Sequence, residues 1–144
     1  MSLGDTLRRQ RERHPEKRAL LFEEQSWTYR QLDAITDRIA ASLLEQGVQP
    51  GDRVALLFSN RPELVFGYYA CFKSGAVALP LNIRFKGPEL AYVLKHCGAR
   101  LFIGQDDLFP EVQAVRARLR GVERFYVSGN ATAFPGVRPF RKLE

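Results

Sequence analysis

Short apolar runs alternate along this chain with longer segments in which apolar residues recur every three or four positions. The four runs are Val54–Phe58, Val77–Leu79, Leu101–Ile103 and Phe125–Val127. An uninterrupted apolar run is typical of a strand buried on both faces, and the wider spacing is typical of an amphipathic helix. Strands that alternate with helices predict a parallel sheet with helices on its faces. The predicted fold class is therefore α/β, with a Rossmann-like order of elements.

The helix boundaries are marked by residues that start or stop helices. Thr28 and Gln31 form a T-x-x-Q capping box, so we expect a helix to begin there and to end at Gly47. Three more helices are expected, from Asn60 to Gly75, from Pro88 to Gly98 and from Asp106 to Gly121. Each of them lies between two of the apolar runs, as a right-handed crossover between parallel strands requires.

The N-terminal part of the chain has a different pattern. A short polar helix is expected over Leu3–Arg13, and the following His14-Pro15 ends it. Two short apolar stretches, Ala19–Phe22 and Trp27–Tyr29, flank the polar turn Glu23–Ser26. This arrangement predicts a small β-hairpin.

The length of the chain, 144 residues, is that of about one domain and is enough to bury a core. After Val127 the sequence becomes rich in Gly, Pro, Asn and Arg. We therefore expect residues 1–127 to form one α/β subdomain and residues 128–144 to be a linker or a frayed tail.

The chain carries a formal net charge of +6, with basic residues grouped near its start, at residues 116–120 and at its end. Solvated helix faces are one explanation of these groups, and an anionic partner is the other. We expect no nucleic-acid partner. Cys71 and Cys97 do not form a CxxC pair, and His96 beside Cys97 is one pair and not a cluster, so we expect no metal site. No apolar run approaches the roughly 20 residues of a membrane span, and no signal peptide is visible, so a cytoplasmic location is expected.

The stretch YVSGNATAFPG, from Tyr126 to Gly136, has the small residues of a phosphate-binding loop. Such a loop needs closely spaced glycines, a lysine that reaches the phosphates and a following helix. Gly129 and Gly136 are too far apart, and Pro139 interrupts the segment that follows. We therefore expect that this stretch is not an ATP site.

A second candidate lies in FKSGAVALPLNIRF, from Phe72 to Phe85. This stretch predicts a helix end, a glycine stop, a strand and a proline exit. Open parallel sheets bind ligands beyond the carboxyl ends of their strands, and Arg84 and Lys86 follow such an end. These two residues are candidates for an anionic ligand, and ordinary surface charge is the alternative.

Several motifs resemble those of the adenylate-forming enzymes. Trp27–Leu32 resembles their first core motif, an apolar residue followed by Thr-Tyr-x-Glu-Leu, and Gly51–Ala55 is similar to their Gly-Asp-x-Val-Ala. Phe72–Asn82 resembles their second motif, Leu-Lys-Ala-Gly, a strand and a Pro-x-Asp/Asn exit. Two segments, His14–Glu16 and Pro80–Arg84, are similar to the corresponding segments of the acyl- and aryl-CoA synthetases. The resemblance extends over roughly Leu7 to Val127.

The resemblance implies a reaction that uses ATP, Mg²⁺ and CoA. A carboxylic acid attacks ATP to give an acyl-adenylate and pyrophosphate, and the CoA thiolate then displaces AMP. The family's Ser/Thr/Gly-rich loop, its adenine and ribose region and its catalytic lysine have no counterpart here. The resemblance thus implies an N-terminal fragment that binds no cofactor by itself, has no catalytic residue and acts as a scaffold for the rest of the same polypeptide. In some CoA ligases of the family, the arginine after Pro-x-Asn-x contacts the phosphate end of CoA. The resemblance therefore implies this role for Arg84, which matches that position, and Lys86 is a weaker candidate.

Two alternatives to the acyl-CoA synthetase remain open at this point. The first is another adenylate-forming enzyme, such as a peptide-synthetase or luciferase-like protein. The second is a free-standing, non-enzymatic module that binds an anion through its basic face.

Overall fold

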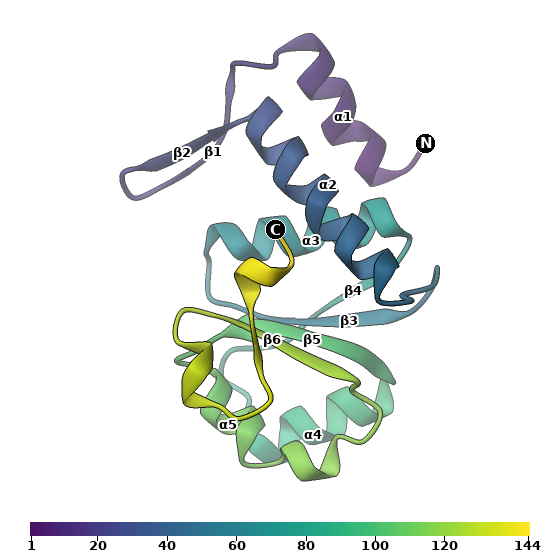
Figure 1. Cartoon of the computed structure of the whole chain (residues 1–144), viewed down its shortest axis with the longest axis vertical. Coiled ribbons are helices and arrows are strands. Elements are labelled where there is room, and N and C mark those ends of the chain that lie inside the picture. Colours follow the sequence, from purple (N-terminus) through teal and green to yellow (C-terminus); the bar gives the residue numbers. More distant parts are fainter.

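The computed structural model describes all of residues 1–144 and consists of a parallel sheet between two layers of helices (Figure 1). The helices are α1 Leu3–Arg13, α2 Tyr29–Glu45, α3 Pro62–Ser74, α4 Gly87–His96 and α5 Phe109–Gln113. The strands are β1 Arg18–Phe22, β2 Gln25–Thr28, β3 Arg53–Leu57, β4 Val77–Pro80, β5 Ala99–Gln105, β6 Arg124–Ser128 and β7 Arg138–Pro139. Three short 3₁₀ turns cover Arg116–Arg118, Ala131–Ala133 and Phe140–Lys142.

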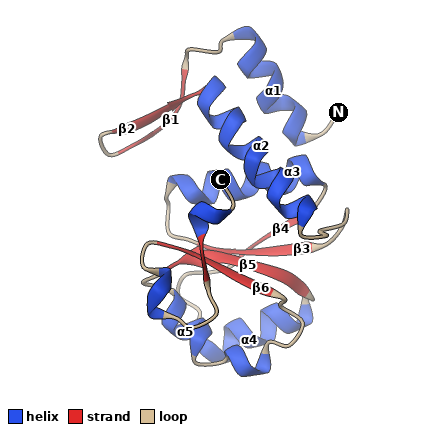
Figure 2. Ribbon diagram, viewed as in Figure 1, coloured by secondary structure: helices blue, strands red, loops and turns tan.

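The main sheet has the order β4-β3-β5-β6-β7, and every neighbouring pair of strands is parallel. Helices α2 and α3 cover one face, and α4 and α5 cover the other (Figure 2). Two apolar clusters fill the spaces between the sheet and these layers. The predicted α/β fold with a parallel sheet is confirmed.

The N-terminal elements lie on the outer side of α2 and α3 (Figure 1). Strands β1 and β2 form an antiparallel hairpin, which confirms the sequence prediction. The predicted capping box is also present, because the Thr28 hydroxyl accepts from the Gln31 N–H and the Gln31 side chain accepts from the Thr28 N–H. This box sets the start of α2 immediately after the hairpin.

The helix expected from Asp106 is much shorter in the structure. Helix α5 begins at Phe109 and ends at Gln113, and a 3₁₀ turn replaces the rest. Pro110 lies in the first turn of α5, and a proline disfavours helical backbone in the residue before it. The Asp106 side chain is used elsewhere, as an acceptor for the backbone of Asn130. The turn that follows β6 therefore draws Asp106 away from a helix start.

The C-terminal segment, expected to be a linker or frayed tail, is packed in the structure. Strand β7 extends the sheet beside β6, and Phe140 and Leu143 are buried in the apolar cluster beneath α2. The Ser42 hydroxyl donates a 2.9 Å hydrogen bond to the Leu143 carbonyl. Apolar side chains spaced three residues apart hold this segment in place although its composition is that of a loop. A subdomain boundary at residue 127 stays a prediction.

No helix of the structure combines the length and the apolar character that a membrane crossing requires.

Candidate functional site

The loop between β4 and α4 carries both of the predicted site residues. It leaves the carboxyl end of β4, where the buried Leu81 donates a 2.8 Å backbone hydrogen bond to Leu56 of β3. The Asn82 side chain then accepts from the Arg84 N–H at 2.9 Å, and the Asn82 carbonyl accepts from the Phe85 N–H at 3.0 Å. A short polar side chain that bonds to backbone two residues on fixes a tight turn. Asn82 thereby fixes the backbone from which Arg84 projects.

Arg84 itself is exposed and forms no ion pair and no side-chain hydrogen bond in the structure. Its guanidinium is planar and carries several N–H donors in a fixed fork, which matches the geometry of a phosphate. An arginine with no intramolecular partner keeps all of these donors available to a ligand. Arg84 is therefore the free cation of this loop.

Lys86 lies two residues further, at the N-terminal cap of α4, and is less available. Its ammonium is 3.7 Å from a carboxylate oxygen of Glu111, although the side chain is 73% exposed. The backbone N–H of Lys86 donates to Glu89 at 2.6 Å, and that of Gly87 donates to Glu111 at 2.9 Å. Two carboxylates thus occupy the start of α4, so an incoming anion would meet the side chains of Arg84 and Lys86 and not an open helix N-terminus.

A second polar group at the same edge of the sheet was not predicted from the sequence. Gln105 ends β5 with its side chain buried, and its carbonyl oxygen accepts from both the backbone N–H of Ser59 at 2.7 Å and its hydroxyl at 3.0 Å. Its amide donates to Asp107 at 2.5 Å, and Asp107 lies 3.9 Å from Arg61. These contacts join the loops after β3 and β5. The only sequence signal is a polar side chain that directly follows a buried strand.

The stretch of residues 126–136 has no charged side chain of its own, and the carboxylate of Asp106 is held against its turn at Gly129 and Asn130. The Asp106 carboxylate accepts the backbone N–H of Asn130 at 2.8 Å, and a Cβ added at Gly129 would collide with that carboxylate. Gly129 has a φ of 82°, so its glycine serves this close approach and the left-handed backbone. A carboxylate held against the loop repels a phosphate, which argues against an ATP site here.

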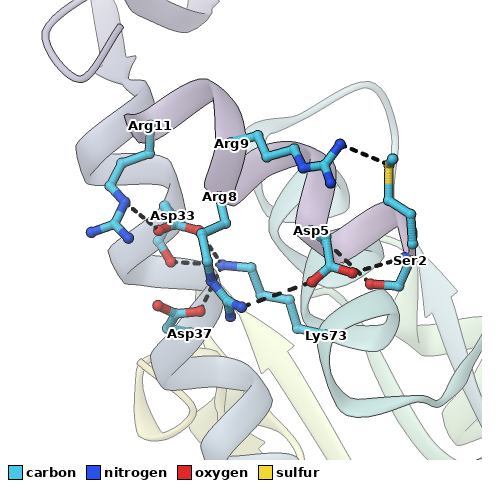
Figure 3. Close-up of polar contacts among 9 residues, drawn as sticks. Ser2, Asp5, Arg8, Arg9, Arg11, Asp33, Asp37 and Lys73 are labelled. Atoms are coloured by element: carbon cyan, nitrogen blue, oxygen red, sulfur yellow. Dashed lines mark hydrogen bonds and ion pairs between the residues drawn. The ribbon is translucent and has the colours of Figure 1, made fainter. Parts of the chain in front are cut away.

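The largest buried charge cluster lies between α1, α2 and α3, away from the sheet edge (Figure 3). The Lys73 ammonium lies 2.5 Å from the Asp33 carboxylate and 2.7 Å from that of Asp37, and it also donates to the Asp33 carbonyl at 3.0 Å. Lys73 and Asp33 are only 4% and 3% exposed. Arg11 Nε is 3.1 Å from the second Asp33 oxygen but is misaligned for a hydrogen bond, so that contact is electrostatic alone.

This cluster fixes how the three helices pack. Helix α1 passes so close to Lys73 that a Cβ added at Gly4 would lie 2.9 Å from its Cγ. From the sequence alone, Lys73 was expected only to lie near the end of a helix, where a positive charge is stabilising. Its partners lie 36 and 40 residues away in the chain, so only the packed helices reveal the cluster. Because all its donors are used inside the fold, Lys73 is a structural residue.

Neither cysteine forms part of a candidate site. Burial raises the pKa of the Cys71 thiol to about 12, so this thiol stays protonated and unreactive near neutral pH. No group of three or more His, Cys, Asp and Glu side chains is arranged to hold a metal ion.

The comparisons with known proteins agree with the fold. The family model for AMP-binding enzymes matches residues 7–136. The 3-hydroxybenzoate/4-hydroxybenzoate–CoA ligase of Thauera aromatica is 34% identical over 126 residues, which cover 88% of this chain and 24% of that protein. A medium/long-chain-fatty-acid–CoA ligase of Mycobacterium tuberculosis is 35% identical over 141 residues, with 91% and 24% covered.

Solved structures show the same similarity. The crystal structure of an anthranilate–CoA ligase in complex with anthranoyl-AMP superposes with a TM-score of 0.91 at 28% identity, over 99% of this chain and 27% of that one. The chain thus spans about a quarter of the length of the relatives it matches. These relatives are named as acyl- and aryl-CoA ligases. Because the family model covers nearly the whole chain, this protein belongs to the AMP-binding enzyme family.

Proposed function

We propose that this chain is the N-terminal α/β subdomain of an ATP-dependent acyl-CoA synthetase. The observation that carries the proposal is the match of residues 7–136 to the AMP-binding family, with relatives about four times longer that are named as CoA ligases. The parent enzyme would act on a small-molecule carboxylic acid with ATP, Mg²⁺ and CoA, in the cytoplasm. The remainder of the same polypeptide would supply the ATP site, the acid pocket and the catalytic lysine.

Within that enzyme the chain has the role of a scaffold. None of its residues is assigned to ATP or Mg²⁺, because the loop of residues 126–136 is occupied by Asp106 and Lys73 is fully paired inside the fold. Alone, the chain is expected neither to form an acyl-adenylate nor to make a thioester. Its contribution to chemistry is limited to the edge of the sheet at which β4 ends.

At that edge Arg84 is proposed to bind the phosphate end of CoA. When CoA is bound, it supplies the thiolate that displaces AMP. Arg84 would hold CoA at its phosphate by charge-assisted hydrogen bonds, which are stronger than neutral ones. The Asn82 turn supports this role because it fixes the Arg84 backbone, and the lack of any internal partner leaves the guanidinium free. Lys86 would add a weaker attraction, because Glu111 already shares its charge.

The Arg84→Ala variant of the longer polypeptide is expected to raise KM for CoA. Hydrogen bonds to a charged group contribute about 1.5–3 kcal/mol, so the change should be roughly 10- to 100-fold. Acyl-adenylate formation precedes CoA binding, and ATP–pyrophosphate exchange should therefore stay at the wild-type rate. Steady-state kinetics with CoA as the varied substrate, together with the exchange assay, measure both effects.

Two control variants sharpen this test. Lys86→Ala should raise KM for CoA less than Arg84→Ala does, and Arg13→Ala, at an exposed arginine on α1, should leave it unchanged. An unchanged KM for CoA in Arg84→Ala would remove Arg84 from the site. An equal loss of pyrophosphate exchange would assign its effect to folding or to ATP instead.

A further inference from the structure

A second basic site lies at the amino-terminal edge of the sheet. Arg124 is the first residue of β6 and Arg138 the first of β7, and both line a hollow of about 550 Å³. Arg116 and Arg120, from the segment after α5, line the same hollow. Parallel strands all begin at one edge of the sheet and end at the other. This hollow therefore lies at the edge where the strands begin, and Arg84 lies at the edge where they end.

The positive charge of the hollow is not balanced from within the protein. Its one acidic lining residue, Glu123, is bound by Arg100 at 3.1 Å, and Arg100 also bonds to Asp52 at 2.6 Å. The hydrogen bonds that Arg100 donates to Asp52 and Glu123 raise the pKa of Arg100. Arg100 is shared by the two carboxylates, so Glu123 keeps part of its charge, but the four arginines that line the hollow outnumber this single acidic residue.

The remaining arginines of the hollow have no such partner. Arg120, Arg124 and Arg138 form no ion pair and no side-chain hydrogen bond. By contrast, Arg8 and Arg11 of α1 lie against Asp5 and Asp33. A basic face that is merely solvated needs no hollow. A site that binds an anion, by contrast, needs unpaired cations that are grouped around a hollow.

One of the four arginines is held in a fixed position. The Arg116 guanidinium lies 4.9 Å from the centre of the Phe125 ring and donates to the Pro135 carbonyl at 2.5 Å. A Cβ added at Gly136 would approach its Nη2 to 3.0 Å, so the chain passes close beside it. A guanidinium held in this way loses little freedom when it binds a ligand.

A second hollow next to this one is lined by further cations. A neighbouring hollow of about 530 Å³ shares Arg120 and adds Arg118 and Lys95, which also lack acidic partners. A single phosphate group accommodates only a few guanidinium donors, so a row of this length fits an anion with two or more phosphoryl groups.

We propose that the hollow lined by Arg116, Arg120, Arg124 and Arg138 binds an anion that carries more than one phosphoryl group. Such a group comes either from a free oligophosphate or from the headgroup of an anionic lipid, and the chemistry of recognition is the same. The site is separate from Arg84 and does not depend on the role proposed for that residue.

Calorimetric titration of the chain with pyrophosphate at low salt tests the proposal. The Arg120→Gln/Arg138→Gln variant should bind pyrophosphate about tenfold more weakly or worse, since two charge-assisted contacts are removed. The matched control Arg13→Gln/Arg18→Gln loses the same charge at exposed positions near the N-terminus and should change the affinity less than about twofold. All four positions are exposed, so both variants should keep the wild-type melting temperature.

Co-sedimentation with vesicles of an anionic phospholipid separates the two sources. Vesicle binding that pyrophosphate displaces, and that Arg120→Gln/Arg138→Gln abolishes, would support the proposal with a lipid headgroup as the ligand. Pyrophosphate binding without vesicle binding would support it with a free oligophosphate. No binding to either probe, or an equal loss in both double variants, would overturn the proposal, because the attraction would then be absent or due to net charge alone.

Discussion

Replacing Lys73 by methionine is expected to lower the free energy of unfolding by about 3–5 kcal/mol. Methionine keeps most of the apolar stem that packs against Gly4, so the change removes the charge and little of the packing. Asp33 is then left buried without its closest cation, and a buried carboxylate that loses its partner is strongly destabilising. Urea denaturation followed by circular dichroism measures the loss as a lower midpoint at constant slope.

A double variant tests whether the effect comes from the unpaired charge. Asp33→Asn added to Lys73→Met removes the stranded carboxylate and should recover at least half of the lost stability. Lys142→Met, at an exposed lysine, should change stability by no more than about 0.5 kcal/mol. If the stability losses caused by the Lys73 and Asp33 substitutions were simply additive, the two residues would not be coupled and the account of this cluster would be wrong.

The Phe102→Ala variant is expected to destabilise the other layer of the fold by about 3–5 kcal/mol. Phe102 of β5 is fully buried, with its ring centre 5.7 Å from that of Phe109 and 5.8 Å from that of Phe125. The ring also fills the space beside Gly104, where an added Cβ would approach it to 2.8 Å. The surrounding strands hold their spacing through backbone hydrogen bonds, so a cavity would remain after the ring is removed.

The same denaturation experiment measures this loss, with Tyr92→Ala as the control. Tyr92 is an aromatic residue of α4 that is 67% exposed, and it stacks only on His96 at 5.4 Å. Its removal should change stability by less than about 1 kcal/mol. A loss below about 1 kcal/mol in Phe102→Ala as well would contradict the packing described for the layer of α4 and α5.

The sequence alone predicted the order of the elements because that order depends on local signals. The capping box at Thr28, the glycine that ends α3 and the uninterrupted run of β3 each act within a few residues. The structure confirmed all three. The start of α5 was predicted too early because the contact that draws Asp106 away comes from Asn130, 24 residues further along the chain.

The buried polar contacts were not predictable for a related reason. Periodicity shows which face of a helix is apolar, but it does not show which charged residues at the edge of that face become covered. Asp33 directly follows the buried Leu32, and only the approach of α1 and α3 excludes water from it. The packing of the last residues depended in the same way on distant partners, since Leu143 is held by Ser42. The position of Arg84 beyond the end of β4 was predictable because the topology fixes it, and the role of Arg84 stays a prediction.

The most direct test of the proposed function is to read the gene beyond the codon for Glu144. If this chain is the N-terminal subdomain of an acyl-CoA synthetase, the reading frame continues and reaches, within some tens of codons, a Ser/Thr/Gly-rich loop that contains Pro-Lys-Gly. That result would place the adenylation chemistry in the remainder of the polypeptide. A natural stop codon directly after Glu144 would contradict the proposal, because the family fold would then exist here without the parts that bind and activate ATP.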